Sequence, residues 1–391
     1  MSTPTVDPAP VLAFGDVRRA GRRVLARLDQ LLAGRWWLVI VVLLAAGVSL
    51  FCAFPTYSGY FPHGRDWLAI QHIADHPFDQ TGLIPSDRPY NFTFRVLVPL
   101  VGGRLGLTPP GYLALQACGA LALFAGTARI VHRITESRRL AALSAIAVGL
   151  TWAGATGFVE IRGNFDSIAI ALLVWAMATR KVPLVVLFGF LATWTDERAL
   201  PALAFVALYH HIVESRDIRW YTALREPRVL AALGAAVLHV ISRLAATAVF
   251  DLHQPSDLGF MNIKAQMSNL PVGAWTGLEG MWLFVALGVV ALWRVRERLL
   301  SLVYLGYVGI FALGAIAVVD VTRSASYLLP AGLAAMAIVA RLCDRRLLHH
   351  TTYAAFALSA AWPLYYAGGA YTMYWNYPLP LVIVRKLAGV E

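Results

Sequence analysis

Short charged segments interrupt the long apolar runs of this chain, and three of them combine residue types that can bind or activate a polar ligand. The turn Glu160-Ile-Arg-Gly-Asn-Phe-Asp166 holds two acids, a cation and a glycine. The triplet Asp196-Glu197-Arg198 lies between two apolar runs, where three charges are costly. Arg323 stands near the start of a later apolar run. Because a planar guanidinium binds two phosphate oxygens at once, Arg323 predicts a phosphate site.

Each of these motifs also has a purely structural interpretation. The turn that ends at Asp166 can be ion-paired, with this aspartate capping the next helix, and both interpretations of the turn stay open. The Asp196 triplet can be a capped hairpin between two helices, but we favour a polar site there. Arg323 can extend its charged head to lipid headgroups, but we favour the phosphate.

A further acid, Asp66, follows the first apolar run and opens the segment Asp-Trp-Leu-Ala-Ile-Gln-His-Ile-Ala. Held at a membrane surface, this carboxylate can take a proton from a hydroxyl group. As a helix N-cap it would serve structure alone, and we favour catalysis. His72 and His76 are spaced i, i+4, but without an HExxH pattern they predict no metal site. No cofactor is required, and a divalent metal is left as an unsupported option.

The elements that must position these residues are membrane-spanning helices. The 391-residue chain is 59% hydrophobic and only 14% charged, with a mean hydropathy of +0.63, and a soluble domain needs more charge than that. Many apolar runs approach the roughly 20 residues that a helix needs to cross the hydrocarbon. We predict an all-α polytopic membrane protein with about eleven transmembrane helices. They cover residues 36–54, 111–131, 140–158, 166–179, 182–195, 198–213, 229–250, 275–293, 299–319, 325–341 and 351–370.

The distribution of Lys and Arg predicts how these helices are oriented. The formal charge is +11, and the basic residues gather in short loops, which is the positive-inside pattern and argues against a nucleic-acid partner. Residues 1–35 are then a cytoplasmic basic segment, and residues 36–391 are one transmembrane domain of the inner (plasma) membrane. Residues 55–110 form a long first extracytoplasmic loop, where Phe92–Leu107 is too short to cross and predicts an amphipathic surface helix. The acids and arginines described above all fall on this extracytoplasmic side.

Together these features resemble the C-type (GT-C superfamily) integral-membrane glycosyltransferases, in particular the mannosyltransferase-like members. Asp66 matches an acid early in a long first outer loop, and surface helices and acidic turns follow it. Arg323, Tyr327 and Pro330 match a late Arg-x-x-x-Tyr-Leu-x-Pro element, and Arg162-Gly-Asn-Phe-Asp166 is similar to a Gly-Asn-x-Asp turn. The chain departs from the pattern in having Trp after Asp66 in place of a second acid, and in having no soluble C-terminal domain.

The resemblance implies transfer of a sugar from a polyprenyl-phosphate donor to an acceptor hydroxyl on the extracytoplasmic face. Asp66 would be the catalytic base. The expected ligands of the donor phosphate are Arg323, Arg162, Arg198 and Lys264. The expected ligands of the sugar or acceptor are Glu160, Asp166, Asp196, Glu197 and Tyr327. The expected partners are the lipid-linked donor, membrane lipids and a glycan, lipid or protein acceptor.

The main alternative is a multi-pass transporter or flippase of a lipid-linked or small polar substrate. Such a protein would carry polar residues through the middle of the bilayer, or paired broken helices in two matching halves. Mid-span charge is nearly absent here apart from Arg243, and no such halves are visible. A polymerase of lipid-linked glycans would have its long outer loop later in the chain, and a scaffold would need no acids in five loops. Glycosyl transfer is therefore the favoured prediction.

Overall fold

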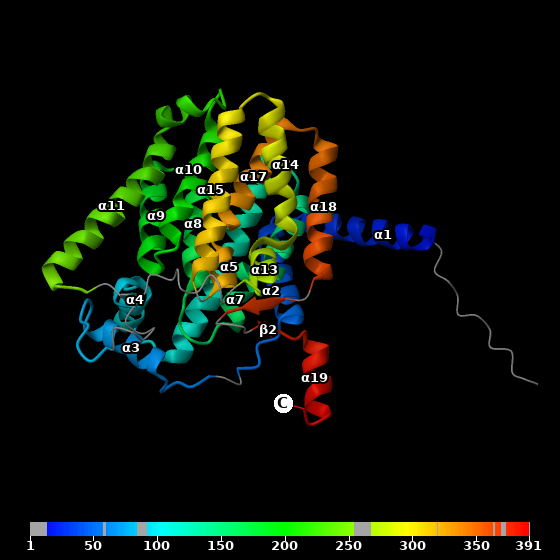
Figure 1. The fold of residues 1–391 in the computed structure, drawn as a ribbon. Coiled ribbons are helices and arrows are strands. Elements are labelled where there is room, and N and C mark those ends of the chain that lie inside the picture. The colour runs from blue at the N-terminus through cyan, green and yellow to red at the C-terminus, as the bar shows by residue number, and fades with distance from the viewer. Residues whose placement is uncertain are drawn as a thin grey trace, which may run out of the picture.

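The computed structural model describes residues 14–57, 60–83, 92–253, 267–318, 320–362, 364–368 and 373–390. Within these residues the protein is nearly all-α, as predicted. Most of the helices run side by side in one bundle, and a short β-hairpin near the C-terminus interrupts the helical pattern (Figure 1).

The N-terminal part supplies one bundle helix and three helices outside the bundle. α1 (Phe14–Leu32) lies across the bundle axis, and α2 (Trp37–Cys52) enters the bundle (Figure 1). α3 (Arg65–Asp75) and α4 (Leu97–Arg104) lie in the predicted first outer loop, at one end of the bundle. The surface helix expected over Phe92–Leu107 is thus shorter than predicted. Gly106, with a φ of 63°, follows its end in the left-handed conformation that commonly terminates a helix.

Most of the remaining bundle helices overlap the segments predicted as spans, but α13 begins before the span predicted over 275–293 and α16 lies mostly before the one predicted over 325–341. They are α5 (Pro109–Thr135), α6 (Arg138–Leu150), α7 (Trp152–Val159), α8 (Asp166–Ala178), α9 (Val182–Thr195), α10 (Ala199–Glu214), α11 (Pro227–Phe250), α13 (Leu270–Leu278), α14 (Trp282–Arg294), α15 (Arg298–Ala317), α16 (Val321–Ser326), α17 (Leu329–Leu342) and α18 (Arg345–Ala361). The 3-10 turn η2 (Trp220–Arg225) precedes α11, and η4 (Glu279–Met281) joins α13 to α14.

Length and composition decide which of these helices could cross a bilayer alone. Five described segments qualify, and they are Pro109–Thr135, Pro227–Phe250, Leu270–Arg294, Arg298–Ala317 and Val321–Leu342. A sixth would be α6 with α7, which bend by 59° between them, whereas α2, α8, α9 and α10 are apolar but shorter. The protein is therefore membrane-embedded and helical, and the total of about eleven spans stays a prediction.

Several helix ends follow directly from the local sequence. Proline stands in the first turn of α5, α9, α11, α13 and α17, where its missing N–H leaves no hydrogen bond unmade. The Ser137 hydroxyl caps α6 by accepting a 3.2 Å hydrogen bond from the amide of Leu140. The Asp344 carboxylate caps α18 in the same way, at 2.7 Å from the amide of Leu347.

Glycine lets α5 and α8 pack closely. A Cβ atom at Gly119 would lie 2.8 Å from Ile168 Cγ1, and one at Gly126 would lie 2.8 Å from Val174 Cγ1. Small residues favour such approach between membrane helices, because they let the two backbones come close enough for van der Waals packing. This packing fixes the start of α8, which is where Asp166 lies.

The last predicted span, residues 351–370, is wrong in its second half. α18 ends at Ala361, and Trp362 is extended, as expected for a residue that precedes a proline. β1 (Tyr365–Ala367) then pairs antiparallel with β2 (Met373–Trp375), with Tyr366 opposite Tyr374. The amphipathic α19 (Leu379–Leu387) follows the hairpin and lies beyond this end of the bundle (Figure 1).

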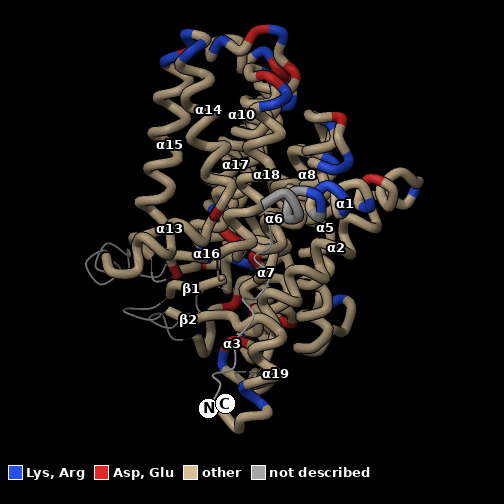
Figure 2. Tube along the Cα trace, turned by 90° about the vertical axis from the view of Figure 1, so that its right-hand side faces the viewer, with Lys and Arg blue, Asp and Glu red and all other residues tan. Residues whose placement is uncertain are grey.

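Charge separates along the bundle axis (Figure 2). Lys and Arg gather at the loops that join α10 to α11 and α14 to α15, at one end of the bundle. Acidic residues near α7 and α16 lie toward the other end, where α19 adds Arg385 and Lys386. The positive-inside rule predicts that the α10–α11 and α14–α15 loops are cytoplasmic, and this orientation stays a prediction.

Candidate functional site

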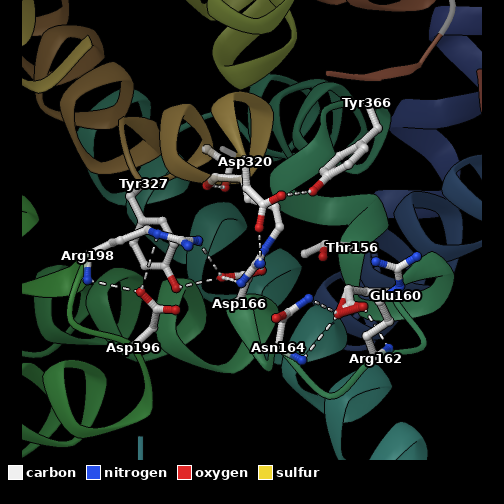
Figure 3. Close-up of polar contacts among 12 residues, drawn as sticks. Thr156, Glu160, Arg162, Asn164, Asp166, Asp196, Arg198, Asp320, Tyr327 and Tyr366 are labelled. Atoms are coloured by element: carbon white, nitrogen blue, oxygen red, sulfur yellow. Dashed lines mark hydrogen bonds and ion pairs between the residues drawn. The ribbon is translucent and has the colours of Figure 1, made fainter. Parts of the chain in front are cut away.

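The centre of the polar site is an ion pair between Asp166 and Arg323. Asp166 begins α8 and is fully buried, after a turn with Gly163 and Phe165 in the left-handed region at φ angles of 72° and 58°. Arg323 of α16 donates to this carboxylate from Nε at 2.7 Å and from Nη2 at 3.3 Å (Figure 3). The hydroxyl of Tyr327, one turn later, donates to it at 3.0 Å. These three hydrogen bonds fix the carboxylate in one orientation.

The C-terminal hairpin completes this part of the site. The remaining terminal nitrogen of Arg323, Nη1, donates to Asp320 at 2.6 Å. The hydroxyl of Tyr366, from β1, donates to the other oxygen of Asp320 at 2.7 Å (Figure 3). The amide of Ala367 donates to Thr322 Oγ1 at 2.9 Å, which ties the strand to α16. The end of the chain thus supplies a side chain to a cluster formed by its middle.

A second ion-paired group is built around Arg95, which the sequence placed on an amphipathic surface and which is in fact buried. Arg95 donates to Glu197 from Nε at 2.9 Å and from Nη2 at 2.6 Å, the bidentate geometry of a strong pair. Its third nitrogen, Nη1, lies 3.3 Å from Asp196 Oδ2. The first outer loop is therefore joined to the loop between α9 and α10.

The pKa values of the two neighbouring acids of this loop, Asp196 and Glu197, are shifted in opposite directions. Burial opposes ionisation of Glu197, but the charge of Arg95 and its hydrogen bonds outweigh burial and hold the pKa of Glu197 below its usual value. Burial dominates at Asp196, where it raises the pKa despite Arg95 and Arg198. Acid pairs whose pKa values are pushed apart are a common feature of sites that do acid–base chemistry.

Arg198 joins the two groups and is the least engaged of the three buried arginines. Its Nη1 lies 3.7 Å from Asp166 Oδ1, and its Nε lies 3.9 Å from Asp196 Oδ1. Neither distance is a hydrogen bond, and Nη1 has no hydrogen-bond partner among the described residues. The side chain also keeps 18% exposure, against 2% for Arg323 and 7% for Arg95. Of Arg95, Arg198 and Arg323, Arg198 is thus the one with hydrogen-bonding capacity to spare.

Glu160 shapes the turn that leads to Asp166. Its carboxylate accepts from the amide of Arg162 at 2.7 Å, from the amide of Asn164 at 3.2 Å and from Asn164 Nδ2 at 2.7 Å (Figure 3). Glu160 therefore has the structural role of stabilising this turn. Asp166 instead belongs to the ion-paired cluster and does not merely cap α8. The side chain of Arg162 is exposed, and Lys264 lies outside the described residues.

Asp66 lies at the edge of this region, in the first turn of α3. Gly64 is the N-cap residue of α3, so Asp66 does not occupy the capping position. The next residue, Trp67, donates from Nε1 to the carbonyl of Ile161 at 3.1 Å, which seats the start of α3 on the turn before Asp166. A Cβ atom at Gly163 would lie 2.2 Å from Ile70 Cδ1, so the contact is close. The start of α3, which carries the half-buried Asp66, is therefore held against the turn that leads to Asp166.

An apolar groove of about 460 Å³ runs along the same helix that Asp166 begins. Its walls come from α4, α5, α8 and α9, and its floor contains small residues. The residues that line it along α5 and α8 are Leu115, Cys118, Gly119, Ala122, Ile168, Ala171, Leu172 and Trp175. A groove of this composition suits a hydrocarbon chain.

The structure thus gathers Asp166, Asp196, Glu197, Arg198, Arg323 and Tyr327 into one cluster. Sequence reasoning did not propose Arg95, Asp320 or Tyr366 as members. Two signals were present, since Arg95 is a charge inside an apolar stretch and Asp320 precedes Arg323 at i, i+3 spacing. Nothing in the sequence pointed to Tyr366.

No three His, Cys, Asp or Glu side chains of the described ranges are placed to hold a metal ion, and His72 pairs with Asp79 at 3.3 Å. Comparisons with protein-family models, with curated proteins and with solved structures found no match to this chain.

Proposed function

We propose that this protein is a C-type glycosyltransferase that moves a sugar from a polyprenyl-phosphate donor to an acceptor hydroxyl on the extracytoplasmic side. The observation that supports it best is the cluster of Arg95, Arg198 and Arg323 with four carboxylates, in which Arg95, Arg323, Asp166 and Asp196 are buried and which lies away from the basic α10–α11 and α14–α15 loops. Buried charge in a membrane protein is by default the mark of a functional site. Arginines beside acids suit a ligand that carries both a phosphate and sugar hydroxyls.

In the proposed reaction the acceptor oxygen attacks the anomeric carbon of the donor sugar. The bond between that carbon and the phosphate oxygen breaks, and its electron pair stays on the phosphate. The acceptor proton passes to a carboxylate, for which Asp66 is the proposed base. The products are a glycoside and polyprenyl phosphate. Because a neighbouring cation balances the charge of the leaving phosphate, no acid has to protonate it.

The geometry suggests a division of labour among the arginines. Arg198 is the proposed ligand of the donor phosphate, because its guanidinium has an unused donor and some exposure. Arg323 is committed to Asp166 and Asp320, and Arg95 to Glu197, so these two are proposed to hold the acids in place. Asp196 Oδ2 lies 3.3 Å from Arg95 Nη1 but accepts no hydrogen bond among the described residues, and it is the proposed acceptor for a sugar hydroxyl.

A lipid-linked donor, as opposed to a soluble one, is supported by the apolar groove along α8. A polyprenyl chain in this groove would lie beside the helix whose first residue is Asp166. The phosphate at the head of the chain would then approach the arginines.

The direct test is transfer by the purified protein in liposomes. The donor would be undecaprenyl-phosphate carrying a radiolabelled hexose or pentose, with a membrane lipid and glycan extract as acceptor. We expect the label to appear in a new product and polyprenyl phosphate to form in equal amount. Arg198→Ala should reduce both, while Arg345→Ala, at an exposed ion pair on the basic end, should not.

A transporter or flippase remains the second candidate because of Glu279, a mid-span acid that the sequence reading overlooked. Its carboxylate is fully buried in the break between α13 and α14, where its φ is 45°. Neither oxygen has a hydrogen-bond partner among the described residues. Lone acids at broken helices occur along transport paths. Movement of intact donor across the liposome membrane, without cleavage, would favour this candidate over transfer.

A further inference from the structure

A row of three aromatic rings leads from the buried cluster to the surface. Trp152 of α7 lies with its ring centroid 4.6 Å from that of Tyr366, and Tyr366 is stacked on Tyr374 at 6.3 Å with an interplanar angle of 28°. Exposure rises along the row, from 6% for Trp152 through the half-buried Tyr366 to 58% for Tyr374. The middle ring of the row is connected to the site, because the Tyr366 hydroxyl donates a hydrogen bond to Asp320.

The hairpin that carries two of these rings is anchored at several points. Tyr366 and Tyr374 are directly opposite in the strand register, so they share one face of the hairpin. The amide of Ala367 donates to Thr322, and the amide of Phe54 donates to the carbonyl of Tyr377 at 3.0 Å. The row is therefore a fixed surface held between α2 and α16, and a ligand that binds there need not order it first.

Two polar groups beside the row have hydrogen bonds still to make. Trp152 Nε1 and Asn376 Nδ2 are both buried, and neither has an acceptor among the described residues. Buried donors in native proteins are nearly always paired, with protein, water or a ligand. Unpaired donors next to exposed ring faces indicate a ligand with hydroxyl oxygens on one side and C–H groups on the other.

We propose that the face formed by Trp152, Tyr366 and Tyr374 binds a carbohydrate chain, the acceptor of the reaction. The C–H face of a sugar ring is positively polarised and packs against the negative face of an aromatic ring. Its hydroxyl groups can accept from Trp152 and Asn376 and donate to Asp320. The end of the chain would then lie at the acids, while the rest extends over Tyr374. This inference rests on the proposed function and narrows its acceptor to a glycan.

The competing role for these rings is a belt at the membrane interface, where Trp and Tyr are enriched. A belt residue keeps its hydroxyl or N–H group in the headgroup region. Tyr366 instead directs its hydroxyl to a carboxylate of the cluster, and the N–H group of Trp152 is buried. Both observations favour a binding face over a lipid contact.

The experiment measures carbohydrate binding without any donor, so that it is independent of transfer. Full-length protein in nanodiscs would be titrated onto an array of immobilised neutral oligosaccharides of hexoses and pentoses. We expect the wild type to bind a subset of them, Tyr374→Ala to lose at least tenfold in affinity, and Tyr374→Phe to retain it. The matched control is Trp220→Ala, an aromatic residue of similar exposure (53%) in the α10–α11 loop.

The outcomes separate this inference from the proposed function. Absence of oligosaccharide binding by the wild type, or equal binding by Tyr374→Ala, would overturn the aromatic site and leave donor cleavage untouched. Binding that depends on Tyr374 together with no cleavage of any polyprenyl-phosphate donor would reject the transferase and keep the carbohydrate site. A belt role predicts lower thermal stability of Tyr374→Ala in lipid with unchanged oligosaccharide binding.

Discussion

The guanidinium of Arg323 makes two hydrogen bonds, of 2.7 and 3.3 Å, to the carboxylate of Asp166, 157 positions earlier in the chain. Asp166 is fully buried and Arg323 is 2% exposed. The pair joins the first residue of α8 to α16, and Arg323 extends the connection to Asp320. The ion pairs of the polar cluster therefore also hold helices of the bundle together.

This geometry predicts that Arg323 contributes mainly to the stability of the fold and less to donor binding. Arg323→Ala leaves the Asp166 carboxylate buried without its cation, which typically costs about 3–5 kcal/mol. We expect a large fall in the thermal midpoint, measured by size-exclusion chromatography after heating. The double variant Asp166→Leu/Arg323→Met should recover most of the loss, since an apolar pair of similar volume removes the stranded charge. A wild-type midpoint in Arg323→Ala with weakened donor affinity would instead place Arg323 on the phosphate.

Arg198 should behave in the opposite way. Its ion pairs at 3.7 and 3.9 Å are loose, so Arg198→Ala should change the thermal midpoint little. Loss of a charged donor aimed at a leaving group typically costs about 100- to 1,000-fold in turnover. Arg198→Lys should recover only part of this, because a point charge cannot hold two oxygens as a guanidinium does. Turnover and donor affinity equal to wild type in Arg198→Ala would remove Arg198 from the phosphate site.

The segments that carry the cluster were visible in the sequence, because charge inside apolar runs is rare enough to stand out. Asp196-Glu197-Arg198 and Arg323 were found in this way, whereas Tyr327 was named only through the resemblance to a family element. Most of the helices were equally visible as apolar runs, although several runs are shorter than a span and the run at 351–370 also included part of the hairpin. A local sequence pattern identifies a residue or a helix at one position along the chain, without indicating which distant residue it contacts.

The pairings could not be predicted, because they join residues that are distant in sequence. A glycine-lined contact between α5 and α8 decides where Asp166 lies, and no periodicity reveals it. Arg95 was assigned to an amphipathic surface because hydropathy alone does not tell which element covers a helix. Glu279 was missed because one acid barely changes the average of a long apolar run. Tyr366 was missed because the hairpin was taken for the end of a span.

The Arg95–Glu197 pair predicts a loss of stability in acid. The pKa of Glu197 is lower in the folded protein than the value of about 4.3 for an unfolded chain. The contribution of ionised Glu197 to the free energy of unfolding is therefore complete at neutral pH. It is lost as the pH falls below the unfolded pKa toward the lower pKa of the folded protein. We expect Glu197→Gln to be less stable than wild type at pH 7, with the difference in thermal midpoint shrinking on acidification. A difference that is constant with pH would show that the pair contributes no charge-dependent stability.

The orientation of the bundle can be tested with single cysteines in a chain whose native cysteines are replaced by alanine. Thr81 and Arg346 are exposed positions at opposite ends. In intact cells, or in spheroplasts if there is an outer membrane, a membrane-impermeant maleimide should label Thr81→Cys at once. It should label Arg346→Cys only after permeabilisation. The reverse pattern would place the polar cluster in the cytoplasm and reject an extracytoplasmic reaction.

Asp66 is the proposed catalytic base, and its position in α3 lets the loss of basicity be tested separately from a loss of helix stability. It lies in the first turn of α3, where a negative charge stabilises the helix by only about 0.3–1 kcal/mol, and Gly64 provides the N-cap position. Asp66→Asn should therefore fold and insert normally, with Trp67 still bound to the Ile161 carbonyl. A positioned base contributes about 100- to 10,000-fold, so turnover should fall by that factor while donor affinity is kept. The matched control is Asp75→Asn, which removes an exposed charge from the other end of the same helix and should retain full turnover.

The measurement is sugar transfer by purified variants with equal thermal midpoints and equal donor binding. If Asp66→Asn turns over within a few-fold of wild type, α3 only covers the site, and the proton must go to an acid of the cluster. Asp166 and Glu197 are then the next candidates, but both are held by arginine through two hydrogen bonds. Replacing either would disturb an ion pair as well as a base. Asp66→Asn instead tests basicity without removing either of the two carboxylates that Arg95 and Arg323 bind through two hydrogen bonds.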